Sequence, residues 1–459
     1  MTDIYHELCR IVGEPYVSNR PEEAYLYSRD PGTMEPRRPD YVVMPNTTEE
    51  VSRVLALANA GRIPVVPMGA GLVLSGLTIP LRGGIVLDLK RMDRIMEVNE
   101  QSRYALVQPG VSQGKLNAYL ARHHPHLKHS MPDAPPAATI AGNILIHGSG
   151  HMSQAYGFHS EMLNGLEVVL PTGEVCLIGS CAASPYWVSR APLPDLAGLF
   201  LGWNGTTGVV TRLALRLFPR PKEEDVMVFV TEDPGMLPRI LGRITATEMA
   251  EDVTVLAGPK PDWIGGFQLT SISFTGNSDE EMTLKRRGIR KALDEYITRK
   301  DGGFMHLLPA MKQGFLETPQ RIFTRFADVR KGGGFEYIGS VMPVDLLPLA
   351  FRRGVEIAER NRTSYVIMAR VIGRCHCVLC NFAYGFNRAD EEDVQRAKKA
   401  LREGNEAVLN LGGIPWKAER PAQRLIIEKM DPNTFRLMTR IRELLDPNRI
   451  MNPGNWERS

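Results

Sequence analysis

The chain has 459 residues, more than the roughly 250–300 at which a single hydrophobic core stops growing, so at least two domains are expected. Hydrophobic residues make up 43% of the sequence and charged residues 23%, and the net charge of +3 gives no reason to expect a nucleic-acid or membrane partner. No segment reaches 18 uninterrupted apolar residues, and six cysteines are too few for a disulfide scaffold in a chain this long. These features predict a cytoplasmic protein without a transmembrane segment.

The first predicted elements are a strand, a helix and a strand that ends in a glycine turn. Tyr41 to Pro45 predicts the first strand, Asn46 to Glu50 begins a helix that Gly61 closes, and Ile63 to Pro67 predicts the second strand. The turn that follows contains small residues, which leave backbone N–H groups open to a ligand. Successive N–H groups can converge on a phosphate, so we expect a cofactor with a pyrophosphate, and a simple tight turn is the alternative.

Further α/β elements follow without a Rossmann fingerprint. Gly83 to Leu89 and Tyr104 to Val111 predict strands, and a helix follows over Leu116 to Ala121. No G-x-G-x-x-G sequence opens a helix, and no acidic strand end lies about 20 residues further on. NAD and NADP are therefore disfavoured as tightly held cofactors.

Three later blocks give the glycine turn a specific meaning. They are a glycine-rich block at residues 131–151, a second one at 203–211, and the sequence Asp-Pro-Asn-Arg-Ile-Met-Asn-Pro-Gly at 446–454. In order, spacing and residue type, the four segments resemble the FAD-binding domain of the vanillyl-alcohol-oxidase and 4-cresol-dehydrogenase superfamily. This superfamily also contains the glycolate-oxidase and D-lactate-dehydrogenase flavosubunits.

The resemblance implies an α+β fold with two main parts. A two-subdomain PCMH-type FAD-binding domain is expected at residues 36–220, and an α+β substrate or cap domain with an antiparallel sheet at 221–415. A helical segment at 1–35 precedes them, and residues 416–459 return to the FAD-binding domain. In the cap, strands are expected near 227–230, 267–274, 336–341 and 365–372, and helices near 283–299, 346–361 and 390–411.

The resemblance also implies an FAD cofactor held by the glycine blocks. The expected contacts are Pro67, Met68, Gly69, Ala70, Gly71, Leu72, Ser75, Pro109, Pro132, Thr139, Gly142, Asn143, His147, Gly148, Gly150, Gly208, Val209 and Val210. Many relatives tether the flavin through a histidine in the first glycine turn, but residues 61–76 contain none, and residues 131–151 contain no cysteine for a second link. We therefore expect non-covalent FAD, while a link from the C-terminal half stays open.

The substrate-site candidates come from the second half of the chain. Trp416-Lys417 stands where the phenol-oxidising branch commonly carries a Tyr-Arg pair. Lys417 keeps the positive charge, but the planar guanidinium group of arginine and the hydroxyl group of tyrosine are lost. Lys417 can hold an anionic substrate, and a solvated surface charge is the alternative. The other catalytic candidates, as acceptors of a hydroxyl proton, are His376, Tyr384 and Glu419. The expected substrate contacts are Arg370, Arg388 and Trp416.

Cys375, His376, Cys377 and Cys380 lie within six residues and could ligate a metal or a cluster. In a strand, however, successive side chains point to opposite faces, so a shared metal would require a loop. The glycolate and D-lactate branch has here an acidic, glycine-rich turn with histidines that can bind a divalent metal, and this chain lacks it. We expect packed thiols and no metal.

The resemblance implies oxidation of an alcohol or 2-hydroxy acid by hydride transfer to flavin N5, with the electrons passed to a separate acceptor. One alternative is 4-cresol-dehydrogenase-like oxidation of a 4-alkylphenol or aryl alcohol. The other is a non-catalytic flavin electron-transfer subunit of a larger complex. The expected partners are a small-molecule substrate and a redox subunit (a cytochrome, an iron–sulfur protein or an electron-transfer protein), in a homo-oligomer or hetero-complex.

Overall fold

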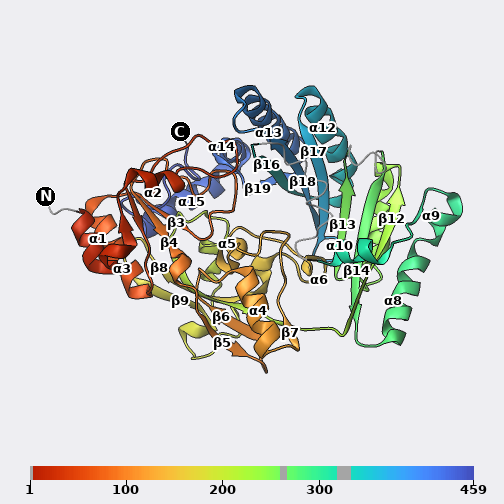
Figure 1. The fold of residues 1–459 in the computed structure, drawn as a ribbon, viewed down its shortest axis with the longest axis horizontal. Helices are drawn as coiled ribbons and strands as arrows, with labels where there is room; N and C mark the ends of the chain where they lie inside the picture. Colours follow the sequence, from red (N-terminus) through yellow and green to blue (C-terminus); the bar gives the residue numbers. More distant parts are fainter. Residues whose placement is uncertain (1–3, 259–265, 318–331, 459) are drawn as a thin grey trace.

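The computed structural model describes residues 4–258, 266–317 and 332–458. Figure 1 shows two parts side by side: the segments up to about residue 220, in red to yellow, and a large sheet with its helices, in green to blue. The C-terminal helices α14 (Arg420–Lys429) and α15 (Pro432–Leu445) lie beside the first part again. Among the described helices, none combines the length and the apolar composition that a bilayer crossing requires.

The first part begins with a small sheet in the order β1-β2-β4-β3. Strands β2 (Tyr41–Val43) and β3 (Val65–Met68) both run parallel to β4 (Ile85–Asp88), and β1 (Val17–Ser18) pairs with β2 at the edge. Helix α3 (Thr48–Gly61) connects β2 to β3 and begins where the Thr47 side chain accepts a hydrogen bond from the Glu50 N–H. Its apolar face packs with helix α1 (Ile4–Val12) in one core, and this packing fixes the position of β3 and of the glycine turn that follows it.

A second, antiparallel sheet has the order β5-β6-β10-β8-β9. Its strands are β5 (Ile95–Asn99), β6 (Tyr104–Val107), β10 (Val209–Arg216), β8 (Leu163–Val169) and β9 (Val175–Gly179). Helices α4 (Gln113–His123) and α5 (Ile140–Leu145) pack on this sheet through Leu116, Leu120, Ile140 and Ile144. The packing orients the start of α5, with its glycine-rich block, toward the end of β3.

The cap contains an eight-stranded sheet in the order β15-β12-β14-β13-β17-β18-β16-β19, in which every neighbouring pair is antiparallel. The strands are β15 (Gly302–Phe304), β12 (Glu223–Thr231), β14 (Gln268–Gly276), β13 (Asp252–Ala257), β17 (Ser364–Ile372), β18 (Cys377–Phe386), β16 (Gly334–Met342) and β19 (Ile414–Trp416). The helix expected over 283–299 is two helices, α8 (Asp279–Ala292) and α9 (Asp294–Arg299). An α+β cap with an antiparallel sheet is therefore confirmed.

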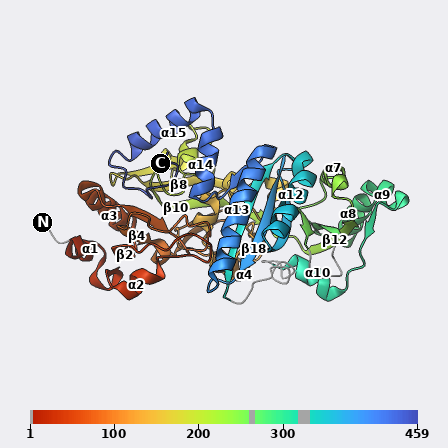
Figure 2. The same cartoon turned by 90° about the horizontal axis from the view of Figure 1, so that it is seen from above.

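One face of the cap sheet is covered by helices. Helices α12 (Leu347–Arg360) and α13 (Glu391–Leu411) lie over β18 in Figure 2, and α7 (Leu237–Thr245) joins them in the cap core. The residues of β17 and β18 alternate: Ile367, Ala369, Cys380, Phe382 and Tyr384 belong to this core. The side chains between them, Val366, Met368, Leu379, Asn381 and Ala383, line a cavity on the other face, toward the FAD-binding part.

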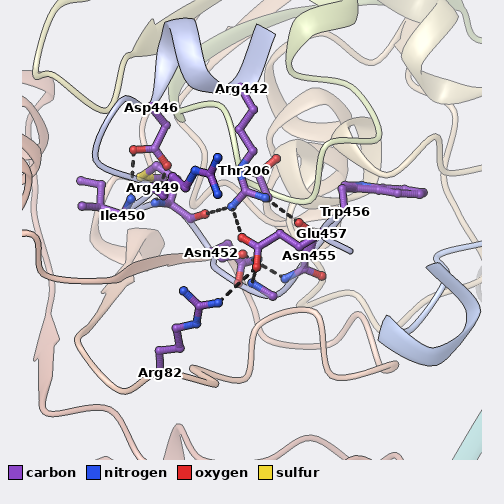
Figure 3. A network of polar contacts seen from close by, with 12 residues as sticks. Arg82, Thr206, Arg442, Asp446, Arg449, Ile450, Asn452, Asn455, Trp456 and Glu457 are labelled. Carbon is purple, nitrogen blue, oxygen red and sulfur yellow. Dashed lines mark hydrogen bonds and ion pairs between the residues drawn. The ribbon is translucent and has the colours of Figure 1, made fainter. Parts of the chain in front are cut away.

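The C-terminal signature pairs with β3, and Figure 3 shows its residues Asp446, Ile450 and Asn452 within a network of polar contacts. Val65 N–H donates to the Ile450 carbonyl, and Asn452 N–H donates to the Val65 carbonyl, both at 2.8 Å. Asp446, fully buried, accepts from the N–H groups of Ile450 at 3.0 Å and Met451 at 2.8 Å. The Asn452 side chain donates to the carbonyls of Leu77 at 2.9 Å and Asn204 at 2.6 Å. The signature therefore joins β3 to two loops near the glycine turn.

Replacing Asp446 by alanine should lower the free energy of unfolding by about 2–4 kcal/mol, because two buried N–H groups lose their acceptor. A lower melting temperature and a lower FAD content are expected together, since the same segment supports β3. Glu443→Ala on the exposed face of α15 is the control, because its pair with Arg449 is solvent-exposed. Equal melting temperatures for the two variants would contradict this role of Asp446.

Candidate active site

The cavity between the two parts has a volume of about 670 Å³. Its walls come from distant stretches of the chain: the turn after β3, the block around α5, the loop before β10, and the cap strands β16, β17 and β18 with Trp416 and Lys417. The glycine blocks and the cap sheet thus form opposite walls of one space.

The turn after β3 has the form of an anion cradle. Within the described part of the chain, none of the backbone N–H groups from Ala70 to Ser75 donates to another protein group, and residues 70–74 line the cavity. Gly71 has φ +68°, which glycine adopts without strain. At Gly69 a Cβ atom would lie 2.6 Å from Thr139 Oγ1, so only glycine lets this turn approach α5. A run of free N–H groups in a turn suits a diphosphate.

The block around α5 presents an asparagine amide to the same cavity. Thr139 caps α5 by accepting from the Gly142 N–H at 3.2 Å. The Asn143 carboxamide oxygen accepts from His159 Nδ1, and His159 Nε2 accepts from the Ser130 hydroxyl at 2.8 Å. Burial lowers the pKa of His159 to about 3, so the imidazole is neutral, as this pattern of one donor and one acceptor requires. The Asn143 NH₂ group is left for a ligand in the cavity, which Asn143 lines.

Replacing His159 by leucine should therefore lower the free energy of unfolding by about 1–3 kcal/mol, because the Asn143 oxygen and the Ser130 hydroxyl both lose a buried partner. Thermal melts of the FAD-bound protein measure this loss. His126→Leu is the control, because that ring is mostly exposed. A melting temperature equal to that of the wild type would show that the hydrogen bonds of His159 with Asn143 and Ser130 do not stabilise the site.

Fourteen of the expected cofactor residues line the cavity: Pro67, Met68, Gly69, Ala70, Gly71, Leu72, Pro109, Pro132, Thr139, Gly142, Asn143, Gly208, Val209 and Val210. Ser75, His147, Gly148 and Gly150 do not line it. Gly148 and Gly150 instead make room for neighbours, since a Cβ would overlap the Asn143 amide at the first and the Met131 carbonyl at the second. His147 Nδ1 lies 2.8 Å from the Ser160 hydroxyl, and Ser75 is buried.

Lys417 reaches the cavity from the cap side. Its Nζ lies 4.2 Å from the centre of the Tyr337 ring and 4.4 Å from that of Trp416. Among the described residues, no carboxylate lies within ion-pair distance of this amine. Burial lowers the pKa of Lys417 to about 7, and the more distant Glu336 opposes the shift only in part. The side chain is thus a partly exposed amine whose neutral form is favoured far more than in water.

Trp416 ties the cap to the FAD-binding part. Its indole N–H donates to the Ile146 carbonyl at 2.7 Å, just after α5. In the sheet register, Met368, Asn381, Gly339 and Trp416 form one row across β17, β18, β16 and β19. A Cβ at Gly339 would lie 2.6 Å from the Trp416 ring and 2.7 Å from Asn381 Oδ1, so glycine keeps both side chains open to the cavity.

Arg370 lines the cavity, but its charge is already neutralised. It donates to both Asp252 carboxylate oxygens at 2.9 Å and to Asp133 at 2.7 Å, and it is 1% exposed. Burial opposes its charge, yet the two carboxylates outweigh this and raise the pKa of Arg370. The expected role as an anion anchor does not agree with this geometry, because the ion pairs join the cap to the Pro132 loop instead.

Four other candidates lie away from the cavity. His376 is exposed in the turn between β17 and β18, and Tyr384 points into the cap core. Glu419 is buried at the start of α14, where it accepts from Asn405 at 2.7 Å and burial raises its pKa to about 8. Arg388 is exposed and donates to the Gly332 carbonyl. These positions argue against direct contact of the four side chains with a substrate.

The cysteine-rich stretch is a hairpin turn followed by a strand, not a continuous strand. Residues 373–376 form the turn, Cys377 begins β18, and Cys380 is buried in the cap core, where burial raises its pKa. Among the described residues, no group of three His, Cys, Asp or Glu side chains could hold a metal ion.

Sequence reasoning missed many of the cavity residues, among them two with polar side chains on the cap wall. Tyr337 lines the cavity and contacts Lys417, and Asn381 lines it with a carboxamide oxygen that has no hydrogen-bond partner in the described structure. The alternation of β18 places Asn381 opposite Tyr384, but alternation alone does not tell which face meets the cofactor.

Comparisons with known proteins agree with this architecture. Residues 39–179 match the family described as FAD binding domain, and residues 269–456 match the C-terminal domain of FAD linked oxidases. The chain is 31% identical over 248 residues to the glycolate oxidase subunit GlcD of Bacillus subtilis, and this alignment spans 54% of the chain and about half (51%) of that relative. It is 26% identical over 430 residues to the mitochondrial D-lactate dehydrogenase [cytochrome] of Arabidopsis thaliana, covering 91% of the chain and 73% of that relative.

The fold itself matches p-cresol methylhydroxylase with a TM-score of 0.84 at 19% identity, over 99% of the chain and 96% of that structure. The two domains and the cradle define a flavin-dependent oxidoreductase, and its cofactor is FAD. The two matched segments correspond to the two domains of FAD-linked oxidases, in the order that the resemblance predicted.

Proposed function

We propose that the chain oxidises the alcohol carbon of a 2-hydroxy acid. The observation that carries this proposal is the Lys417 amine, which lies in the cavity opposite the FAD cradle and has no carboxylate of the described chain in ion-pair contact. The names of the relatives that act on glycolate and D-lactate support a CH–OH donor. We further predict that the FAD is bound non-covalently and that the chain has a redox partner. The domain boundaries and the cytoplasmic location are likewise predictions.

In this proposal Lys417 manages the proton of the reaction. FAD held by the turn after β3 and by Asn143 would supply the hydride acceptor for the alcohol carbon. A neutral amine has one lone pair and two N–H groups, so Lys417 accepts the hydroxyl proton while it donates to the adjacent carboxylate. The substrate loses a hydride and a proton and becomes a 2-oxo acid, and the resulting ammonium group pairs with its carboxylate. Tyr337 and Trp416 exclude water from the amine and hold it between their rings.

The proposal predicts a pH dependence with a definite sign. Lys417 must be neutral to accept the proton, so kcat/KM for flavin reduction should rise as pH increases through about 7 and should level off above it. Anaerobic stopped-flow measurements of flavin bleaching from about pH 5.5 to about pH 9 test this. A profile that falls over this range would contradict a lysine base.

A substrate panel separates the proposal from its alternatives. Enantiomers of 2-hydroxy acids, 4-alkylphenols and aryl alcohols are mixed anaerobically with the FAD-bound protein. We expect 2-hydroxy acids to bleach the flavin. Oxidation of a 4-alkylphenol or aryl alcohol is the second candidate, favoured by the aromatic side chains Phe335, Tyr337 and Trp416 in the same cavity. Absence of bleaching by every donor would favour an electron-transfer subunit, and variation of the acceptor among oxygen, quinones and cytochromes then identifies the partner.

A further inference from the structure

Among the described residues on the cap wall of the cavity, Asn381 has a buried side-chain oxygen without a hydrogen-bond partner. Asn381 lies in the middle of β18, is 5% exposed, and lines the cavity. Within the described structure its Oδ1 atom is buried and accepts no hydrogen bond. A buried acceptor without a donor is costly, so such a group in a binding cavity indicates a donor on the ligand.

Neither amide atom of Asn381 has a hydrogen-bond partner among the described residues, and although Oδ1 itself is buried, a flip of the amide plane exchanges the oxygen and the NH₂ group at the cavity. Gly339 stands directly across the strand pair from Asn381 and has no side chain to cover the amide. On its other side, Met368 is the paired residue, and Leu379 and Ala383 flank it along β18 on the same face. These neighbours carry no donor that could satisfy the oxygen.

The rest of this wall is apolar and offers no second charge partner. Val366, Met368, Leu379 and Ala383 are uncharged, and Arg370 at its end is paired with Asp133 and Asp252. A second carboxylate on the substrate would be desolvated here without a cation among the described residues. An apolar group would instead displace water from this surface.

We propose that the face formed by β16, β17 and β18 is the subsite for the substrate's side chain, and that this side chain is apolar except for one hydroxyl group, which forms a hydrogen bond with the Asn381 carboxamide. A hydroxyphenyl group has this chemistry, and Phe335 and Tyr337 supply aromatic neighbours for it. This inference rests on the proposed oxidation of a 2-hydroxy acid at Lys417. Asn381 then determines specificity and takes no part in the proton transfer.

The test uses the FAD-bound full-length protein and both enantiomers of three 2-hydroxy acids: 4-hydroxyphenyllactate, phenyllactate and 2-hydroxyglutarate. We expect kcat/KM for flavin bleaching to be at least about tenfold higher for 4-hydroxyphenyllactate than for phenyllactate, because only the former satisfies Asn381. The kcat/KM for 2-hydroxyglutarate should be lower than that for phenyllactate by about a hundredfold or more. Asn381→Leu should remove the preference for the phenol while phenyllactate is still oxidised.

Met368→Lys provides a second variant, in which a cation of similar length enters the apolar wall. It should raise the relative kcat/KM for 2-hydroxyglutarate by at least about tenfold, whereas Met368→Leu should keep the wild-type order. A wild-type preference for the dicarboxylate, or an unchanged phenol preference in Asn381→Leu, would overturn the subsite. If no 2-hydroxy acid bleaches the flavin, the proposed function fails, and this result differs from bleaching with the wrong order of substrates.

Discussion

Replacing Lys417 by methionine is expected to lower the rate of substrate-dependent flavin reduction by about 10²–10⁴-fold, the usual contribution of a general base. Methionine has a similar length and can fill the space between the Tyr337 and Trp416 rings, so the cavity keeps its shape while the proton acceptor is lost. Anaerobic stopped-flow absorbance with the best donor of the panel measures the rate. The FAD content per protein should stay at the wild-type value, because Lys417 lies on the cap side of the cavity.

Lys417→Arg separates the two roles of the amine. Arginine keeps the charge but does not accept a proton near neutrality. The Lys417→Arg variant should therefore reduce the flavin as slowly as Lys417→Met, and its kcat/KM should not rise through about pH 7. Recovery of the rate in Lys417→Arg would assign an anchoring role alone. Lys115→Met is the surface control, since that side chain is 45% exposed and pairs with Asp93. Wild-type kinetics in Lys417→Met would reject the site altogether.

Replacing Gly71 by glutamate is expected to weaken FAD binding by about 10²–10³-fold. The new carboxylate enters the turn whose free N–H groups face the cavity, and two charges about 4 Å apart near a protein surface interact by about 4 kcal/mol. The ratio of flavin to protein absorbance after gel filtration, and a fluorescence titration of the apoprotein with FAD, measure the effect.

Gly71→Ala is the matched control for backbone strain. Both substitutions place a Cβ at φ +68°, which costs about 1–2 kcal/mol, but only glutamate adds charge. The nearest atom to this Cβ is Met68 Sδ at 3.3 Å, and this flexible side chain can move aside. Alanine should therefore keep most of the FAD. Equal flavin content in the two variants would show that the turn does not hold the diphosphate.

The cofactor half of the site could be predicted from the sequence because its parts are local. A glycine turn after a strand, as at Met68 to Leu72, exposes N–H groups whatever the remainder of the chain does, and a threonine at a helix start caps the helix, as Thr139 does. Even here, Gly148 and Gly150 were expected to touch the cofactor, and they are glycines because Asn143 and Met131 need the space. A glycine at a contact and a glycine behind it look the same in sequence.

The substrate half depends on pairings between distant strands. A shift of one residue in register exchanges the two faces of a strand, so Tyr384 and Asn381 could not be assigned to core and cavity from β18 alone. The ion pairs of Arg370 join it to residues 118 and 237 positions away, and no local pattern reveals such partners. Burial, which shifts the pKa of Lys417, is likewise a property of the assembled cavity.

The sequence by itself determined the family, the FAD cofactor and the α+β architecture, because these follow from ordered local blocks with strict backbone requirements. Only the tertiary structure decided which charged side chains are free. In the part of the chain that the structure describes, it brings Lys417 to the cavity without an ion pair, neutralises Arg370 with two carboxylates, and leaves the Asn381 oxygen without a donor. The physical reason is that desolvation and pairing depend on every neighbour in space, and most of these neighbours are remote in the chain.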